Sequence, residues 1–234
     1  MIAKKFELAN VGSVMIIKRQ SSRHLKLSIS PQGEVRVSIP KWVPYQVGLD
    51  FANSKRLWIE QKRPKLTPLI DNQPVGRAHR LKFHQDHNEQ RIKTRINGNN
   101  ITITFPDRLN YDHPSVQWAA RLAAVRALRR QAVSLLPQRL DALSNAHSLT
   151  YTDVQVKRMS SRWGSCDQEK RIVLNLYLIQ LPWELIDYVI LHELTHTLHL
   201  NHGAAFWASL ETFLPQAKQQ KKIISQYRPG ILTV

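Results

Sequence analysis

The segment His192-Glu193-Leu194-Thr195-His196 decides the fold of this chain. It lies near the end of an apolar stretch, residues 182–200, that predicts a helix. Residues four apart on a helix share one face, so His192 and His196 can direct imidazole nitrogens at the same ion. Glu193 stands beside them, where a carboxylate can act as general base on a metal-bound water. The pattern therefore predicts a metal-dependent hydrolase, with one zinc ion per chain as the default metal.

A catalytic zinc site needs a third protein ligand, and His202 is the candidate. It follows the first histidine at the spacing of the longer H-E-x-x-H-x-x-G-x-x-H pattern, although His199 occupies the glycine position. We expect Asn201 and Gly203 to supply the left-handed backbone of a turn that brings His202 back toward the ion. The alternative is three histidines on a solvated helix end, and the presence of Glu193 where the mechanism needs it argues against that alternative.

Composition and charge limit the classes of protein to consider. The chain has 234 residues, 42% of them hydrophobic, which is typical of a globular protein. No apolar run is long enough to span a bilayer, and the single cysteine, Cys166, cannot form an intrachain disulfide, so we expect a cytoplasmic protein. Lys and Arg number 34 against 17 acidic residues, giving a formal net charge of +17 that favours polyanionic partners such as nucleic acid.

Hydrophobic periodicity divides the chain into two parts. Residues 1–112 read as a β-rich N-terminal region, beginning with a strand at 14–18 and a hairpin at 25–39 that turns at Pro31. One short helix is predicted over residues 44–63. Three more strands follow at 80–84, 91–96 and 101–105, the last two joined by an Asn-Gly turn.

Residues 113–234 carry the helical signals. A long helix is predicted over 116–143, kinked or broken near Pro137, followed by strands at 152–157 and 171–179. The metal-site helix and two shorter helices at 204–213 and 216–227 complete the chain, and no internal repeat is evident. Together the patterns predict an α+β protein with a small sheet over the H-E-x-x-H helix.

Motifs around this helix carry a resemblance to a known family. They comprise Arg162-Trp163-Gly164-Ser165-Cys166, Asn175, Asp187-Tyr188-Val189, the H-E-x-x-H segment, Asn201-His202 and Phe206-Trp207. In these motifs the chain resembles the YgjP-like metallopeptidases, predicted metal-dependent hydrolases that are similar to the SprT-like and WLM zincins. The resemblance implies zinc held by His192, His196 and His202, with Glu193 as base. We also expect Phe206 and Trp207 to be core residues under the metal site that help to hold His202 in place.

Other residues are candidates for contacts with a polypeptide substrate. Arg162, Tyr188 and His199 each offer a donor or cation to an oxyanion, and sequence alone does not choose among them. The predicted strand 171–179 is the candidate sheet edge for binding a peptide as an added strand, with Asn175 reaching the substrate or the preceding loop. Arg162, Asn175 and Tyr188 are therefore the predicted substrate-binding residues.

Three readings of function remain open. The first is a zinc metallopeptidase, and since the related SprT-like and WLM proteins include proteases of DNA-bound proteins, the net charge of +17 suggests nucleic-acid-associated substrates. The second is a hydrolase of non-peptide amides. The third is a nucleic-acid-binding module with a structural zinc, which requires a fourth ligand such as His199.

Overall fold

We describe the protein from a computed structural model that covers residues 2–8, 11–30, 33–62 and 67–231. The predicted turn residues Pro31 and Gln32, and the end of the predicted helix at Arg63, lie outside these described residues. The fold is α+β, as predicted, and the chain divides into two compact units, Met1–Pro68 and Leu69–Val234. Among the described residues, no helix has both the length and the apolar character needed to cross a bilayer.

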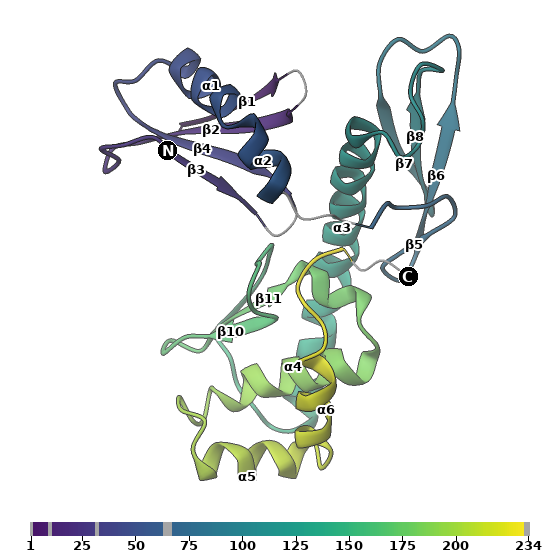
Figure 1. Cartoon of the computed structure of the whole chain (residues 1–234). Coiled ribbons are helices and arrows are strands. Elements are labelled where there is room, and N and C mark those ends of the chain that lie inside the picture. Colours follow the sequence, from purple (N-terminus) through teal and green to yellow (C-terminus); the bar gives the residue numbers. More distant parts are fainter. Residues whose placement is uncertain (1, 9–10, 31–32, 63–66, 232–234) are drawn as a thin grey trace. The chain divides into compact units, whose positions relative to one another are not determined.

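The first unit is a four-stranded sheet with two short helices (Figure 1). The strands lie in the order β1-β2-β4-β3, with β2 and β4 parallel and the outer pairs antiparallel. Helix α1 packs closely on one face, because a Cβ atom added at Gly48 would lie 3.2 Å from side-chain atoms of Ile16 and Ile39. The elements are β1 (Ile2–Leu8), β2 (Gly12–Arg19), β3 (Lys26–Ile29), β4 (Val35–Pro40), α1 (Tyr45–Ser54) and α2 (Arg56–Lys62).

The second unit begins with another four-stranded sheet, in the order β5-β6-β8-β7. The long helix α3 (Pro114–Ala146) covers its inner face, where Leu81, Ile101 and Ile103 are fully buried. Although Pro137 lies within α3, the helix runs on through it, so the predicted break does not occur. The strands are β5 (Pro74–Val75), β6 (His79–Gln85), β7 (Lys93–Asn97) and β8 (Asn100–Phe105).

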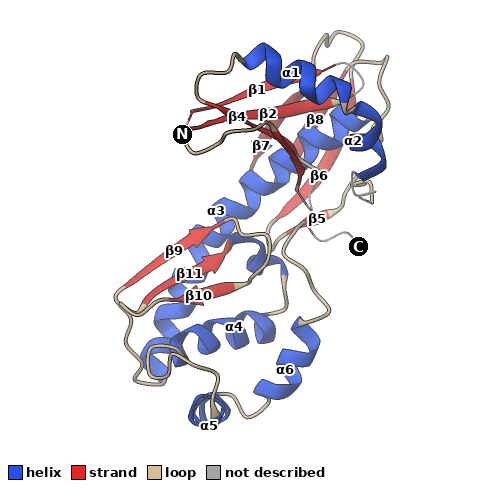
Figure 2. Cartoon of the chain, turned by 60° about the vertical axis from the view of Figure 1, so that its left-hand side comes forward, coloured by secondary structure: helices blue, strands red, loops and turns tan. Residues whose placement is uncertain are grey.

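The sequence placed a boundary at residue 112, but the compact units divide after Pro68. The reason is the packing of α3, whose first half covers β5–β8 while its second half packs on the remaining elements (Figure 2). The side chains of Leu81, Ile103 and Leu128 belong to the same buried cluster as Leu194 on the H-E-x-x-H helix. Hydrophobic periodicity reports which residues are buried, and it does not report which element they are buried against.

The rest of the second unit is a small sheet and three helices. The sheet order is β10-β11-β9, with β10 antiparallel and β9 parallel to the central strand. As predicted, this sheet lies over the H-E-x-x-H helix, α4, which contacts β10 and β11 (Figure 2). The elements are β9 (Asp153–Lys157), β10 (Gly164–Cys166), β11 (Arg171–Asn175), a 3-10 helix η1 (Leu176–Gln180), α4 (Trp183–Thr195), α5 (Ala204–Phe213) and α6 (Ala217–Ile224).

Two local predictions in this region were wrong. Residues 176–179 continue as the 3-10 helix η1 instead of as strand, because the Asn175 side chain accepts a hydrogen bond from the Tyr177 N–H and turns the chain. The predicted edge strand β11 lies in the centre of the sheet, and β10 and β9 are its two edges.

Candidate metal centre

Three histidines from the end of α4 and the following turn converge on one point. Each offers one ligand atom, and these atoms lie within 4.8 Å of one another. The Nε2 atom of His202 lies 2.9 Å from that of His192 and 3.2 Å from that of His196. A tetrahedral zinc ion with Zn–N bonds of about 2.0–2.1 Å separates its ligand atoms by about 3.3 Å. We call His192, His196 and His202 the histidine cluster, and its donors fit a metal ion.

The pKa shifts of His192 and His196 also suit a metal. Burial, with the charges of His196, His202 and Lys221 when protonated, lowers the pKa of His192 to about 3. Burial also lowers the pKa of His196, against a hydrogen bond to the His199 carbonyl that acts to raise it. Because neutral imidazole is the form that ligates metals, these rings are held ready for an ion at neutral pH.

Packing fixes the orientation of the three rings. The fully buried ring of Phe206 lies 4.9, 4.7 and 4.7 Å, centroid to centroid, from His192, His196 and His202. The His196 Nδ1 atom donates to the His199 carbonyl oxygen at 3.0 Å, which directs Nε2 of the same ring toward the cluster. The His192 Nδ1 atom is buried with no partner among the described residues, so packing against Phe206 and Tyr188 sets the orientation of this ring.

The turn that returns His202 differs from the prediction in its backbone. Helix α4 ends at Thr195, and His196 keeps helical dihedral angles as its C-cap, so the two first histidines stay on one face. Gly203 has φ −73° at the start of α5, and Asn201 is not among the described residues with positive φ. The turn therefore needs no left-handed residue. Phe206 and Trp207, both on α5, lie beside His202 at centroid distances of 4.7 and 6.3 Å; Phe206 is a core residue, whereas Trp207 is only partly buried.

Glu193 lies against strand β10. Its side chain is buried, and burial raises its pKa to about 8, opposed by the positive charge of Arg162. A Cβ atom added at Gly164 would lie 2.6 Å from Glu193 Oε1 and 2.7 Å from its Cγ, closer than real atoms approach. Only glycine fits at position 164 without moving the carboxylate. Sequence reasoning missed this residue, although a glycine within a strand is itself a signal of close approach.

Strand β10 has one open edge. In its antiparallel pairing with β11, Asn175 donates to the Trp163 carbonyl and Asp167 donates to the Arg171 carbonyl. Residues along such a strand alternate between pointing their N–H and C=O groups toward the partner strand and away from it. The N–H and C=O groups of Gly164 and Cys166 point away from β11 and have no partner among the described residues. The open edge therefore offers the backbone N–H and C=O groups of two residues, Gly164 and Cys166, to a further strand. Gly164 is also the residue that packs against Glu193.

The predicted substrate-binding residues have different positions. Asn175 is fully buried, with its Nδ2 atom donating to the Met159 carbonyl at 2.9 Å and to the Arg162 carbonyl at 2.8 Å. It therefore holds the loop before β10, which is the second of the two roles predicted for it. Arg162 is exposed and near enough to lower the pKa of Glu193. Tyr188 is buried with its ring 5.8 Å from that of His192, and its pKa is raised to about 12 by burial and by Glu193.

Neither His199 nor Cys166 belongs to the cluster. The His199 Nε2 atom lies 2.9 Å from the Ser209 hydroxyl, and the cluster of possible metal ligands found in the described residues contains three histidines without it. Burial, together with the charges of Glu193 and Asp167, raises the pKa of the Cys166 thiol to about 11, so the thiol stays protonated and is a poor nucleophile.

An ion pair fixes α4 to α3. The guanidinium of Arg139 donates to both carboxylate oxygens of Asp187, at 2.7 and 2.6 Å. Such paired bonds restrain both distance and orientation. Asp187 lies on α4 five residues before His192, so this contact orients the helix that carries the first two histidines.

Comparisons with known proteins found one family model and one solved structure that are similar to this chain. The model of a family described as YgjP-like, metallopeptidase domain, matches residues 23–227. No curated protein matches the chain. Among solved structures, the metallopeptidase zymogen abylysin from Pyrococcus abyssi is similar to 42% of this chain over 100% of its own, with 18% sequence identity and a TM-score of 0.37.

Proposed function

This chain belongs to the YgjP-like family of metallopeptidase domains, and from that premise we propose that it is a zinc peptidase with Glu193 as its general base. The observation that carries the proposal is the convergence of three Nε2 atoms beside a buried carboxylate. His192, His196 and His202 would hold the ion. Three protein ligands leave a position for water or substrate, as catalysis requires.

The residues of the site have separate roles in this proposal. The ion, when bound, supplies a Lewis acid that polarises the scissile carbonyl and acidifies water. Glu193 Oε1 or Oε2 accepts the proton of the attacking water and passes it to the leaving amine. Gly164 leaves the space in which this carboxylate is held. Arg162 is the candidate cation for the developing oxyanion, because it is exposed on the loop that leads to β10.

A peptide substrate would bind as a strand beside β10. The open backbone groups of Gly164 and Cys166 supply the hydrogen bonds of such a pairing, and they lie next to Glu193. This arrangement favours peptides over small amides, since main-chain pairing recognises an extended polypeptide. It replaces the expectation that β11 binds the substrate.

Metal content and cleavage of an unfolded protein test the proposal together. The wild type should contain one zinc ion per chain by mass spectrometry and cleave the substrate. Glu193→Gln should keep the ion and lose cleavage by about 10²–10⁴-fold, the usual contribution of a general base. His202→Ala should lose most of the ion. Retention of the ion by His202→Ala with undiminished affinity would exclude this residue as the third ligand, and full activity of Glu193→Gln would exclude the base.

Other first-row divalent ions also bind sites of three imidazoles, so the mass spectrum should be read for all of them. A structural zinc with four protein ligands is the poorer alternative, because His199 bonds to Ser209. The single cysteine supports a cytoplasmic location. The net charge of +17 supports substrates associated with nucleic acid, a finer proposal that requires a surface able to bind it.

A further inference from the structure

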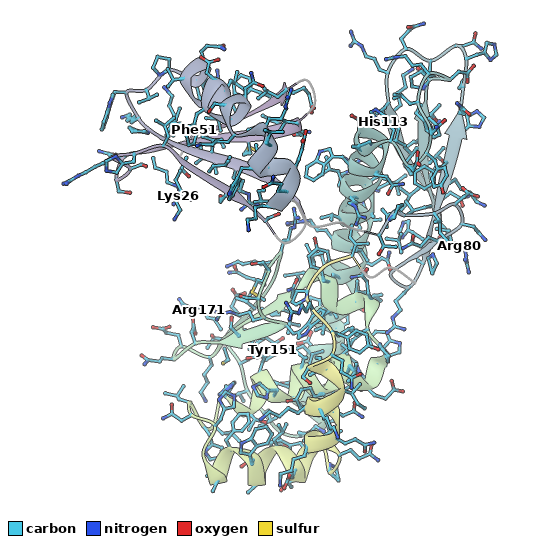
Figure 3. The ribbon with its side chains drawn as sticks, in the orientation of Figure 1. Lys26, Phe51, Arg80, His113, Tyr151 and Arg171 are labelled. Atoms are coloured by element: carbon cyan, nitrogen blue, oxygen red, sulfur yellow. The ribbon has the colours of Figure 1, made fainter. Side chains whose placement is uncertain are left out.

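The outer face of the sheet β6-β8-β7 carries only basic and uncharged polar side chains. The strand register defines three rows across this face: Arg80, Asn100 and Asn97; Lys82, Thr102 and Arg95; His84, Thr104 and Lys93. Strand spacings of about 4.8 Å and about 3.4 Å per residue give these rows an area of roughly 10 by 14 Å. We call Arg80, Lys82, His84, Lys93 and Arg95 the basic face; Figure 3 shows Arg80 on β6.

The cations of the basic face are exposed and mostly lack acidic partners. Lys82, His84 and Arg95 have no side-chain partner among the described residues. The Arg80 guanidinium donates to the Asn72 carbonyl at 3.0 Å, and Lys93 lies 2.5 Å from the carboxylate of Glu89. Because Lys82 and Arg95 flank Thr102 on β8, the Cα atoms of these two residues, whose charges are not neutralised, lie about 10 Å apart across the centre of the face.

The core of this sheet lies on its other face. The opposite side chains of the same strands are apolar, with Leu81, Ile101 and Ile103 fully buried beneath α3. A sheet packed on one face holds its other face rigid, so the cations are presented at fixed spacing. The open face of the first unit differs, because it carries Met15 and Ile17, and its Arg36 is paired with Glu34 at 2.5 Å.

The side chains of the face fit one class of partner. Arg, Lys, Thr and Asn are the side chains that contact phosphate and sugar in nucleic-acid complexes. Insertion into a membrane surface requires apolar side chains beside the cations, and the nine positions of these rows contain none. The nine positions also contain no Phe, Tyr or Trp, the side chains that give most base stacking, so stacking is a minor source of affinity here. The chemistry favours contact with a phosphodiester backbone, independent of base sequence.

We infer that the basic face binds the phosphate backbone of nucleic acid and thereby brings the peptidase to proteins associated with it. The inference rests on the proposed function and adds to it the surface through which the protein contacts nucleic acid. Binding is measured without cleavage, so its failure is distinguishable from failure of the peptidase proposal.

Fluorescence anisotropy with labelled DNA and RNA of mixed sequence, from 50 to 200 mM salt, tests the inference. The double variant Lys82→Glu/Arg95→Glu should weaken binding by about tenfold or more and lower the slope of log Kd against log salt by about 2. The matched control Lys26→Glu/Lys55→Glu, at exposed positions in the first unit, changes the net charge equally and should leave the slope unchanged. Lys82→Gln/Arg95→Gln repeats the test without introducing negative charges, and thermal melting checks that each variant folds.

Three outcomes would overturn the inference. The first is equal weakening by the variant and its control, which would make the interaction a property of total charge. The second is no binding of the wild type to any nucleic acid at 50 mM salt. The third is preferential binding of polyglutamate, or of vesicles containing anionic lipid, through Lys82 and Arg95, which would make the partner an acidic polypeptide or a membrane.

Discussion

The histidine cluster and the basic face both consist of basic side chains, but in opposite environments. At the cluster, burial lowers the pKa of His192 and His196, and packing makes the rings convergent, with Phe206 in contact with all three. On the face, cations stand apart on a rigid sheet in full contact with solvent. The difference teaches that a site for chemistry depends on exact distances, whereas a site for polyanions depends on charge density. A small displacement should therefore destroy the first and leave the second unaffected.

Of the substitutions considered, Gly164→Ala should have the largest effect, because it should impair cleavage and leave nucleic-acid binding intact. The added methyl group overlaps Glu193, and misplacing a catalytic group by about 1 Å can cost about 10²-fold in rate. We expect loss of cleavage by this amount with metal content and nucleic-acid binding retained, measured by single-turnover cleavage and mass spectrometry.

Ser165→Ala is the control for this prediction, because the neighbouring side chain points to the other face of β10. Activity of Gly164→Ala equal to that of the control would show that Glu193 can move without loss, and would contradict its role as a positioned base.

The reactivity of a cysteine thiol should also differ between the region beside Glu193 and the basic face. With a pKa of about 11, raised above its ordinary value by burial and by the charge of Glu193, Cys166 is almost wholly protonated at pH 8. Two pKa units correspond to about 10²-fold less thiolate, so alkylation by iodoacetamide should be slower by about that factor than in urea-unfolded protein.

A cysteine placed between the cations gives the comparison. In a Cys166→Ala background, Thr102→Cys lies between Lys82 and Arg95, whose charges favour the thiolate. It should react faster than Cys166 in the folded protein, and its reactivity should fall as salt is added. Equal rates for the two thiols would contradict the difference in environment.

Asp187→Asn should have the smallest effect. It removes the charge from the pair with Arg139, whose side chains are 19% and 40% exposed, so we expect a loss of about 1 kcal/mol in unfolding free energy. This corresponds to a fall in Tm of about 2–4 °C, measured by calorimetry, with the metal retained. Asp167→Asn, at the more exposed pair with Arg171, should give no measurable fall. A fall in Tm that is larger for the control Asp167→Asn than for Asp187→Asn would contradict the role of Arg139 in holding α4.

The two four-stranded sheets of the chain have the same topology, which the sequence did not reveal. In both sheets the two central strands are parallel to each other, and each of them pairs antiparallel with the strand on its outer side. Each sheet is followed by a helix that packs on one of its faces, although α1 has 10 residues and α3 has 33. The signal is weak because alternation fixes only which residues face inward, and many sequences satisfy it.

The sequence by itself identified the candidate metal ligands of this protein. The four-residue spacing of His192 and His196 follows from helix geometry, and the helix itself is a local consequence of apolar periodicity. The α+β class and most strands followed from the same local patterns. The spacing of His202 made it a candidate ligand, and the structure brings it beside the other two histidines.

Only the tertiary structure decided what surrounds that chemistry. The position of β10 at the sheet edge, and the contact of Gly164 with Glu193, depend on pairing between segments that are distant along the chain. The basic face likewise depends on the register of β6, β7 and β8, since a slip of one residue would turn each set of cations into the core. The local sequence determines which residues of a strand face the core, whereas the pairing between strands determines which side chains lie beside one another.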